Sequence, residues 1–447
     1  MWKYLSVFCF LTNNAFSLEL PACFKHLRGQ VDDCYCKVED VDNTHSVSFE
    51  PLSKLVQRNY FRYYKVNLDK PCIFWKERGE CTRSTCALKT CTQAEVPVGL
   101  ADNNNKSSGP TCEEEQELSK INNVISDDRI AALQKLEKHE ADNINFCVQE
   151  DEDSEKAEFY DLLQNPERYT GYSGEPARRI WRSIYEENCF KPKKDSLFID
   201  LTHKSINYMC KEKRVFFRVV SGLHSSISIH LAAKYPVQDF FGQKWGPNLA
   251  EFSRRFLPES TNGEGPHWLK NLYFVYLVEM RAITKALPLW KSWDFYTGNP
   301  EEDTKTKEDV VDIVESLLSC PDTFDEAQLF KGPAAGEILN DFLVHFRNIS
   351  QIMDCVTCDK CRLWGKIQIR GLGTALKILF SGGKPENLAL ERGEVVTLFN
   401  AFNQLSHSLH YVKQFKDQMD YSEYPGPPEE SDRKQDNIFS TFSRGEL

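Results

Sequence analysis

The chain has 447 residues, of which 41% are hydrophobic and 27% are charged. These fractions are those of a globular protein with a large core, and they exclude a collagen, a coiled coil and a wholly disordered chain. The formal net charge is −11, from 55 basic and 66 acidic residues, which argues against general nucleic-acid binding. Sixteen cysteines are more than the stability of such a core requires, so the use of these cysteines is the main question.

The N-terminus has the pattern of a cleaved secretory signal peptide over residues 1–17. Lys3 supplies a basic start, Tyr4 to Leu11 is an apolar run, and the small residues Ala15 and Ser17 fit a cleavage site. A buried N-terminal strand is the weaker alternative. The mature chain is therefore predicted to enter an oxidising compartment, where disulfides persist.

No later segment is predicted to cross a membrane. The most apolar one, Trp268 to Trp290, carries four charged residues and is expected to be a buried helix. Two glycosylation sequons, at Asn105 and Asn348, agree with a lumenal surface, although such short motifs often arise by chance.

The first part of the mature chain, residues 18–91, is rich in cysteine. Between its cysteines, Leu52 to Tyr64 is amphipathic and predicts a helix. Residues 92–153 shift to Asn, Ser, Gly and acidic residues, which predicts a long mobile loop with one short helix at Asp128–Lys138.

From residue 154 to 422 the hydrophobic pattern is mostly helical, and strand-like alternation is scarce. The composition of residues 423–447 predicts a disordered tail. The fold is therefore expected to be mainly α, with one bundle-like domain. The predicted helices are Glu155–Leu163, Pro176–Asn188, Val215–Ala233, Leu249–Phe256, Leu269–Ala286, Val310–Leu318, Ala335–Cys355, Cys358–Ile369, Leu372–Phe380 and Gly393–Met419.

The strongest cysteine motif is Cys355-Val-Thr-Cys358-Asp-Lys-Cys361. Residues three apart on a helix share a face, and a helix N-terminus stabilises a thiolate, so Cys358 and Cys361 fit a redox dithiol. An iron–sulfur cluster is disfavoured because the next cysteine of a ferredoxin run is replaced by Gly365 and Lys366. Zinc is disfavoured because no second ligand pair can be nominated, while an inert structural disulfide remains an alternative.

A second motif is Cys81-Thr-Arg-Ser-Thr-Cys86, with Cys91 five residues later. Small polar neighbours predict an exposed loop, and an exposed loop disulfide exchanges readily with other thiols. Beside the first dithiol, this pair suggests a relay.

A dithiol relay needs an electron acceptor, which side chains cannot supply, so it implies a flavin, a quinone or a partner protein. The composition offers Trp181 for stacking and Arg168, His224 and Arg281 for polar contacts, although each is by default a core or surface residue. His224 and His230 lack a carboxylate at ligand spacing, so no metal site is expected.

Gly371-Leu-Gly373 begins like a dinucleotide-binding loop. Because Leu376 stands at the sixth position and no strand precedes the motif, we predict a turn between two helices instead.

Four longer motifs carry a family resemblance that spans about Cys23 to Tyr411. They are residues 59–67 (Asn-Tyr-Phe-Arg-Tyr-Tyr-Lys-Val-Asn), 165–172 (Asn-Pro-Glu-Arg-Tyr-Thr-Gly-Tyr), 184–192 (Ile-Tyr-Glu-Glu-Asn-Cys-Phe-Lys-Pro) and 358–366 (Cys-Asp-Lys-Cys-Arg-Leu-Trp-Gly-Lys). With these motifs the chain resembles the endoplasmic reticulum oxidoreductins, flavin-dependent oxidases of protein disulfide isomerase.

The resemblance implies a single compact helical domain, residues 18–422, that encloses FAD in its core of residues 154–422. Cys358 and Cys361 match an inner dithiol beside the flavin, and Cys81 and Cys86 match an outer shuttle dithiol. Cys91 and Cys112 match regulatory cysteines that pair with the shuttle when the enzyme is switched off. The structural disulfides that the resemblance implies are Cys23–Cys36, Cys72–Cys355 and Cys189–Cys210.

FAD contacts carry over from the family to Arg168, Thr170, Trp181, Ser221, His224 and Arg281. This chain departs from the family pattern where Trp268 occupies the place of an arginine, since an indole cannot form an ion pair with a phosphate. It departs again at Lys25, which replaces a cysteine and leaves Cys34 without its usual mate. Cys320 has no counterpart in the pattern.

The implied activity is the oxidation of protein disulfide isomerase and related thioredoxin-fold proteins through the two dithiols and FAD, with molecular oxygen as the final acceptor and hydrogen peroxide as the product. We expect a monomer in the endoplasmic reticulum lumen that binds no nucleic acid. The final Arg-Gly-Glu-Leu is not the retention tetrapeptide, so a partner would hold the protein there, and peripheral membrane association stays open. The alternative from another class is a non-catalytic lumenal binding module for a chaperone partner.

Overall fold

The computed structural model describes most of the chain between Phe24 and Tyr421. The predicted signal peptide, the helix expected at Asp128–Lys138 and the C-terminal tail lie outside the described residues. The described residues are 24, 27–31, 36–75, 81, 86–101, 145–147, 152, 154–167, 174–190, 202–239, 242–321, 323–382, 386 and 388–421.

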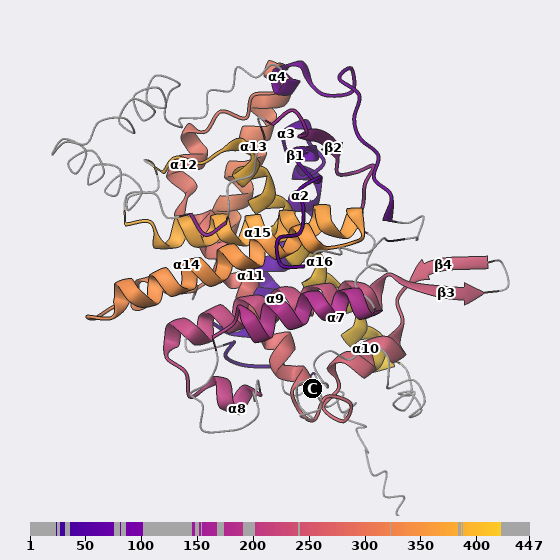
Figure 1. Ribbon diagram of the computed structural model, residues 1–447, viewed down its shortest axis with the longest axis vertical. Helices are drawn as coiled ribbons and strands as arrows, with labels where there is room; N and C mark the ends of the chain where they lie inside the picture. The colour runs from indigo at the N-terminus through magenta and orange to yellow at the C-terminus, as the bar shows by residue number, and fades with distance from the viewer. Residues whose placement is uncertain are drawn as a thin grey trace, which may run out of the picture.

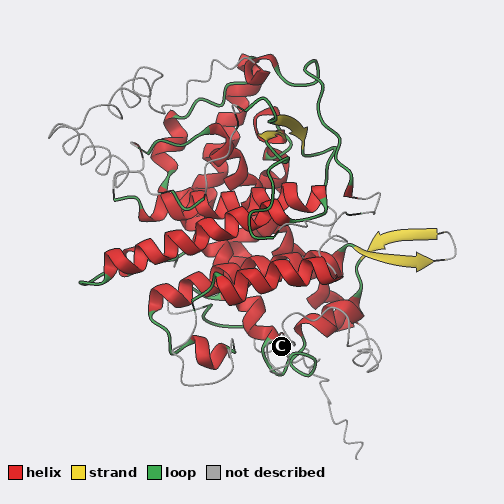
Figure 2. Ribbon diagram, in the orientation of Figure 1, coloured by secondary structure: helices red, strands yellow, loops and turns green. Residues whose placement is uncertain are grey.

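Helices dominate the described part of the chain, which confirms the predicted mainly α fold (Figure 2). The longer helices are α2 (Val38–Leu55), α9 (Lys211–Ala233), α11 (Gly265–Lys285), α13 (Pro300–Leu317), α14 (Ala335–Ile352), α15 (Asp359–Phe380) and α16 (Arg392–Tyr421). The shorter ones are α3 (Asn59–Arg62), α4 (Val98–Ala101), α7 (Gly174–Arg182), α8 (His203–Ile206), α10 (Leu249–Phe256), α12 (Leu287–Ser292), the π-helix η3 (Ser183–Glu187) and the 3₁₀ turns η4 (Glu326–Gln328) and η5 (Met353–Cys355).

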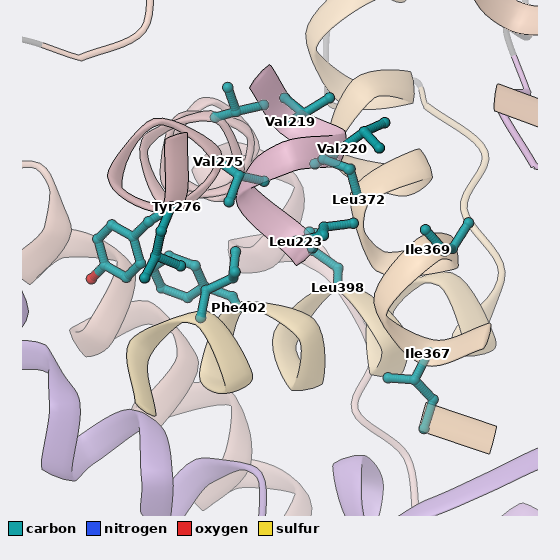
Figure 3. Close-up of a cluster of buried hydrophobic side chains, with 14 of the residues drawn as sticks. Val219, Val220, Leu223, Val275, Tyr276, Ile367, Ile369, Leu372, Leu398 and Phe402 are labelled. Carbon is teal, nitrogen blue, oxygen red and sulfur yellow. The ribbon is translucent and has the colours of Figure 1, made fainter. Parts of the chain in front are cut away.

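The core lies where α9, α11, α15 and α16 pack against one another (Figures 1 and 3). Figure 3 shows Leu223 of α9, Tyr276 of α11, Leu372 of α15 and Phe402 of α16 directed into this interior. All four side chains are at most 4% exposed. Along much of their length these four helices are buried on every side, so they form the centre and the other helices cover them.

Helix α9 is long and apolar enough to span a membrane by length and composition alone. In this structure 89% of its apolar window is buried inside the protein, so α9 is a core helix. The segment Trp268–Trp290, expected to be a buried helix, is buried as well, and it forms most of α11 and the beginning of α12.

Two short antiparallel sheets accompany the helices. Strand β1 (Tyr63–Val66) pairs with β2 (Glu158–Asp161), and β3 (Tyr235–Asp239) pairs with β4 (Gly242–Gly246) as a hairpin that extends from the body (Figure 1). The predictions of a helix at Glu155–Leu163 and a helix continuing to Tyr64 were therefore wrong. Local periodicity cannot reveal a pairing between segments almost one hundred residues apart.

Helix α15 is continuous, so the predicted turn at Gly371 was wrong as well. A Cβ atom at Gly371 would lie 2.5 Å from the Thr397 carbonyl oxygen of α16, so the glycine allows two helices to pack closely. Buried charges also obscured the helix in the sequence. Arg370 is paired with Glu391, and Lys377 is paired with Glu394, at 2.7 and 2.8 Å.

Candidate active site

The predicted inner dithiol lies at the N-terminus of α15. Cys358 is the N-cap residue, Cys361 is in the first turn, and their sulfur atoms are 2.8 Å apart and fully buried. The free amides of this first turn favour a thiolate, whereas burial raises the pKa of Cys361 well above its usual range. The neighbouring thiols Cys358 and Cys86 raise it further. Cys361 is therefore held as a thiol until another group removes its proton.

The predicted shuttle dithiol meets the inner dithiol in this structure. The sulfur atoms of Cys81, Cys86 and Cys358 all lie within 4.8 Å of one another, and Cys86 is also within hydrogen-bonding reach of Cys361. Cys86 is buried, whereas Cys81 is partly exposed. Thiol–disulfide exchange needs contact between sulfur atoms, and four sulfurs from distant parts of the chain satisfy that requirement here.

Two anchors hold the shuttle segment against α15. On one side a disulfide joins Cys72 to Cys355, with Cα atoms 4.6 Å apart. On the other side the Asn165 side chain accepts a hydrogen bond from the Lys89 amide at 2.8 Å and donates one to the Lys89 carbonyl at 2.7 Å. The indole N–H of Trp364 in α15 then donates to the Asn165 carbonyl at 2.8 Å. The segment between Cys72 and Lys89 is thus fixed at both ends beside the inner dithiol.

Charged groups around the dithiol are paired. The buried Arg362 donates to the Leu68 carbonyl at 2.8 Å and pairs with Asp359. The buried Lys366 ammonium pairs with Asp354 at 2.7 Å. Each of these cations on α15 is therefore balanced by a carboxylate.

An apolar cavity of about 690 Å³, counting the space that opens to solvent, adjoins α15 one turn beyond Cys361. A Cβ atom at Gly365 would lie 2.9 Å from Met353 Sδ, so the glycine preserves this close wall. The side chains that line the cavity include Ala177, Trp181, Val220, Leu223, Met353 and Gln368.

Aromatic stacking marks one wall of this cavity. The Trp181 and His224 rings stack with centroids 3.7 Å apart and planes inclined by 10°. Tyr185 Oη lies 3.1 Å from His224 Nδ1, and burial lowers the pKa of His224 well below its usual range, so its imidazole is neutral. On the next turn of α9, Ser221 Oγ accepts a hydrogen bond from Asn271 at 2.9 Å. An apolar space lined by one flat aromatic side chain, Trp181, which stacks on the neutral His224, suits the ring system of a flavin.

The structure brings together only some of the predicted FAD contacts. Trp181, Ser221 and His224 form one group, while Arg168 and Thr170 lie outside the described residues. Arg281 is engaged elsewhere, in a two-point ion pair with Glu326 at 2.9 and 3.1 Å.

Trp268 is buried and lines a second cavity of about 390 Å³ together with Arg214 and Arg218. These two arginines place positive charge beside the residue that replaces the family arginine. The structure therefore offers cations at this position although the sequence pattern lacks one.

The other predicted cysteine pairs are not joined in the described part of the chain. Cys189 is buried and Cys210 is exposed, and no disulfide links them. Cys36 lies 3.9 Å from Cys320, sulfur to sulfur, and its predicted partner Cys23 is outside the described residues. These two pairings stay predictions.

The regulatory and glycosylation predictions fall partly outside the described residues. Cys91 is half-buried and its amide bonds to the Phe159 carbonyl at 2.9 Å, whereas Cys112 and Asn105 are not described. Asn348 lies on α14 and is half-buried.

Sequence reasoning missed the residues that support the site. Asn165 anchors the shuttle segment, and Gln368 donates to both oxygens of the buried Glu167 at 3.2 Å. Asn165 and Glu167 belong to the motif at 165–172, but single residues in a motif do not reveal their partners. Gly365 could have been noticed as a glycine inside a strong helical pattern.

Four converging thiols next to an apolar cavity lined by Trp181 define a dithiol oxidoreductase that requires an organic redox cofactor. Comparison with known proteins agrees. Residues 48–412 match the family Endoplasmic Reticulum Oxidoreductin 1. The chain is 44% identical to ERO1-like protein alpha of Rattus norvegicus over 427 residues, covering 88% of this chain and 91% of the relative. It is 41% identical to Ero1-like protein of Drosophila melanogaster over 439 residues, covering 88% and 90%.

Solved structures agree with this assignment. The structure of Ero1p, described as the source of disulfide bonds for oxidative protein folding in the cell, aligns with a TM-score of 0.57 at 25% identity, covering 85% of this chain and 97% of that one. A cysteine-substituted Ero1p of S. cerevisiae aligns with a TM-score of 0.55 at 27% identity, covering the same shares. This chain belongs to the Endoplasmic Reticulum Oxidoreductin 1 family.

Family membership confirms several predictions together. The protein is a FAD-dependent thiol oxidase that supports oxidative protein folding, as its relatives are. It is an enzyme, so the alternative of a non-catalytic binding module is set aside. Proteins of the family reside in the endoplasmic reticulum and act in general with protein disulfide isomerase.

Proposed function

We propose that electrons travel from a reduced thioredoxin-fold partner to Cys81–Cys86, then to Cys358–Cys361, and from there to FAD. The single observation that supports this path is the approach of the sulfur atoms of Cys81, Cys86 and Cys358 to within 4.8 Å. Without it, the two dithiols would be separate features of a long sequence.

The first step is exchange at the outer disulfide. A thiolate of the partner attacks the Cys81 sulfur, the Cys81–Cys86 bond breaks, and Cys86 leaves as a thiolate. The second partner thiol displaces Cys81, so the partner departs as a disulfide and the shuttle keeps two electrons and two protons. Cys81 is assigned the outer role because it is partly exposed, whereas Cys86 is buried.

The second step is exchange between the two dithiols. The Cys86 thiolate attacks Cys358 in the inner disulfide, Cys361 leaves as a thiolate, and Cys81 then displaces Cys358 to restore the outer disulfide. The first-turn amides of α15 stabilise the thiolate that leaves. Trp181, Ser221 and His224 would hold FAD, which would supply a two-electron acceptor for the reduced inner dithiol, with oxygen as the final acceptor and hydrogen peroxide as the product.

The proposal extends to compartment and regulation. A cleaved signal peptide over residues 1–17 would deliver the chain to the endoplasmic reticulum lumen, where protein disulfide isomerase is the partner. Pairing of Cys81 with Cys112 and of Cys86 with Cys91 would withdraw the shuttle and switch the enzyme off. The backbone of Cys91 is bonded to Phe159, so Cys112 would make the larger movement.

The relay is tested with FAD-loaded protein in an oxygen electrode, using a reduced thioredoxin-fold substrate. Cys358→Ala should lower oxygen consumption by at least about 1,000-fold, because Cys361 then has no partner with which to form the inner disulfide. Cys147→Ala removes a cysteine outside the four-sulfur group and should turn over like the parent. Persistent turnover in Cys358→Ala would refute the relay.

A trapping experiment tests the order of exchange. In a variant carrying Cys81→Ala and Cys361→Ala, the remaining thiols Cys86 and Cys358 should form a disulfide that peptide mapping detects. Recovery of both as separate thiols under oxidising conditions would contradict direct exchange between them.

A further inference from the structure

The two cysteine pairs of the active site also have the spacings of a metal-binding protein. Cys81 and Cys86 form a Cys-x4-Cys pair, and Cys358 and Cys361 form a Cys-x2-Cys pair. Structural zinc sites are commonly built from two such short-spaced pairs. From the sequence, zinc was disfavoured because no second ligand pair could be nominated. The fold places the Cys81–Cys86 pair beside the Cys358–Cys361 pair and so supplies it.

We propose that the fully reduced active site binds one soft divalent cation, of which Zn²⁺ is the type, through the thiolates of Cys81, Cys86, Cys358 and Cys361, and that the bound ion stops the relay. The proposal uses the sulfurs of the proposed function and adds a metal-dependent form of regulation to it.

The distances suit a tetrathiolate site. A tetrahedral ion with metal–sulfur bonds of about 2.3 Å holds its sulfurs about 3.8 Å apart. Here three sulfurs lie within 4.8 Å of one another, and the fourth, Cys361, lies 2.8 Å from Cys358 and within hydrogen-bonding reach of Cys86. Shifts of about 1 Å in side-chain position would complete the geometry.

The electrostatics also suit the bound form. Four thiolates and one dication carry a net charge of −2, which the α15 N-terminus partly offsets. A coordinating cation deprotonates a thiol outright, so the ion itself supplies the charge that four thiolates need.

No electrons move when the ion binds. Four S–H bonds lose protons to buffer, and four metal–sulfur bonds form. An enzyme with either disulfide intact lacks two of the four ligands. Binding is thus confined to the enzyme that carries electrons on both dithiols, and it competes with transfer of those electrons.

The test uses the FAD-loaded, full-length protein, reduced without oxygen by a phosphine and freed of reductant. Co²⁺ alone is the first probe, since tetrahedral thiolate coordination gives it strong visible and near-ultraviolet absorption bands. We expect one Co²⁺ per chain, displacement of the bands by one equivalent of Zn²⁺, and protection of the four active-site cysteines from alkylation. When Co²⁺ is added to the oxidised protein, no Co²⁺–thiolate bands should appear.

Variants locate the ion. Cys86→Ser and Cys358→Ser should each weaken Co²⁺ binding by at least about 100-fold, whereas Cys147→Ser should bind like the parent. The proposal is overturned if the reduced parent shows no thiolate bands, or if both active-site variants keep the parent's affinity. Alkylation of the parent gives the same answer without any variant, should a variant fail to fold.

The metal site and the electron relay can be refuted independently of each other. Metal binding is measured on reduced protein that does not turn over, and the relay is measured as oxygen consumption in a metal-free buffer. An active relay with no Co²⁺ bands would remove the metal site and leave the proposed function intact.

Discussion

Gly222 lies on α9 where this helix crosses α11, between Ser221 and the cavity-lining Leu223. A Cβ atom at this position would lie 2.3 Å from the Asn271 carbonyl oxygen and 2.7 Å from Val275 Cγ1. The first contact is with backbone, so no side-chain rotation can relieve it. Gly222→Ala must therefore push the two central helices apart by about 1 Å.

Two opposing effects set the size of the change. Alanine in place of glycine inside a helix stabilises by about 1 kcal/mol, while overpacking a core costs about 1–3 kcal/mol and more against rigid backbone. We expect Gly222→Ala to be destabilised by about 2 kcal/mol, which raises the unfolding equilibrium constant about 30-fold. The movement also strains the hydrogen bond from Asn271 to Ser221, so the variant should retain less FAD.

Urea unfolding followed by tryptophan fluorescence measures the stability, and the flavin absorption of purified protein measures FAD retention. Gly336→Ala in α14 is the matched control, because nothing lies within 4 Å of the added Cβ. It should be as stable as the parent or up to about 1 kcal/mol more stable. If Gly222→Ala unfolds at the same urea concentration as Gly336→Ala, the close helix crossing is not as tight as described.

Three further changes test the fold. Replacing both Cys72 and Cys355 with alanine removes a disulfide that closes a loop with a sequence separation of 283. The loss of loop-closure entropy should lower the free energy of unfolding by at most about 5–6 kcal/mol, and an unchanged urea midpoint would contradict this. Glu279 is fully buried, and burial raises its pKa well above the usual range, so the parent should lose stability as the pH rises above about 4.5. In urea unfolding, Glu279→Gln should then be more stable than the parent at pH 8 but not at pH 4.5. The same stability difference at both pH values would refute the raised pKa of Glu279. Burial lowers the pKa of His407 to about 4, so below pH 6.5 a proton binds the unfolded chain more readily than the folded protein. The free energy of unfolding should therefore fall by about 2 kcal/mol between pH 7 and pH 5. His407→Gln should flatten that dependence in thermal unfolding, and an unchanged slope would count against it.

The fold class could be predicted because the hydrophobic pattern of helices such as α10 and α16 is local. The sheet formed by β1 and β2 could not, since each strand has four residues and is specified by a distant partner. The continuity of α15 was missed for a different reason. Its buried cations look like surface residues until their partners on other elements are known.

The two dithiols could be predicted from spacing and helix position, but their contact could not. That contact depends on the Cys72–Cys355 disulfide and on Asn165, which holds Lys89. No spacing rule relates residues so far apart in sequence. Likewise, the replacement of an arginine by Trp268 looked like a loss of charge, and only the fold brings Arg214 beside it.

The two anchors of the shuttle segment also set a local concentration. Cys81 is nine residues from Cys72 and eight from Lys89, so whatever path the chain takes, it stays within about 30 Å of both. One thiol confined to a sphere of that radius has an effective concentration on the order of 10 mM at the inner dithiol. A free thiol protein at about 10 µM would meet the inner dithiol roughly a thousand times less often, so the length of one short segment selects which thiols reach the flavin.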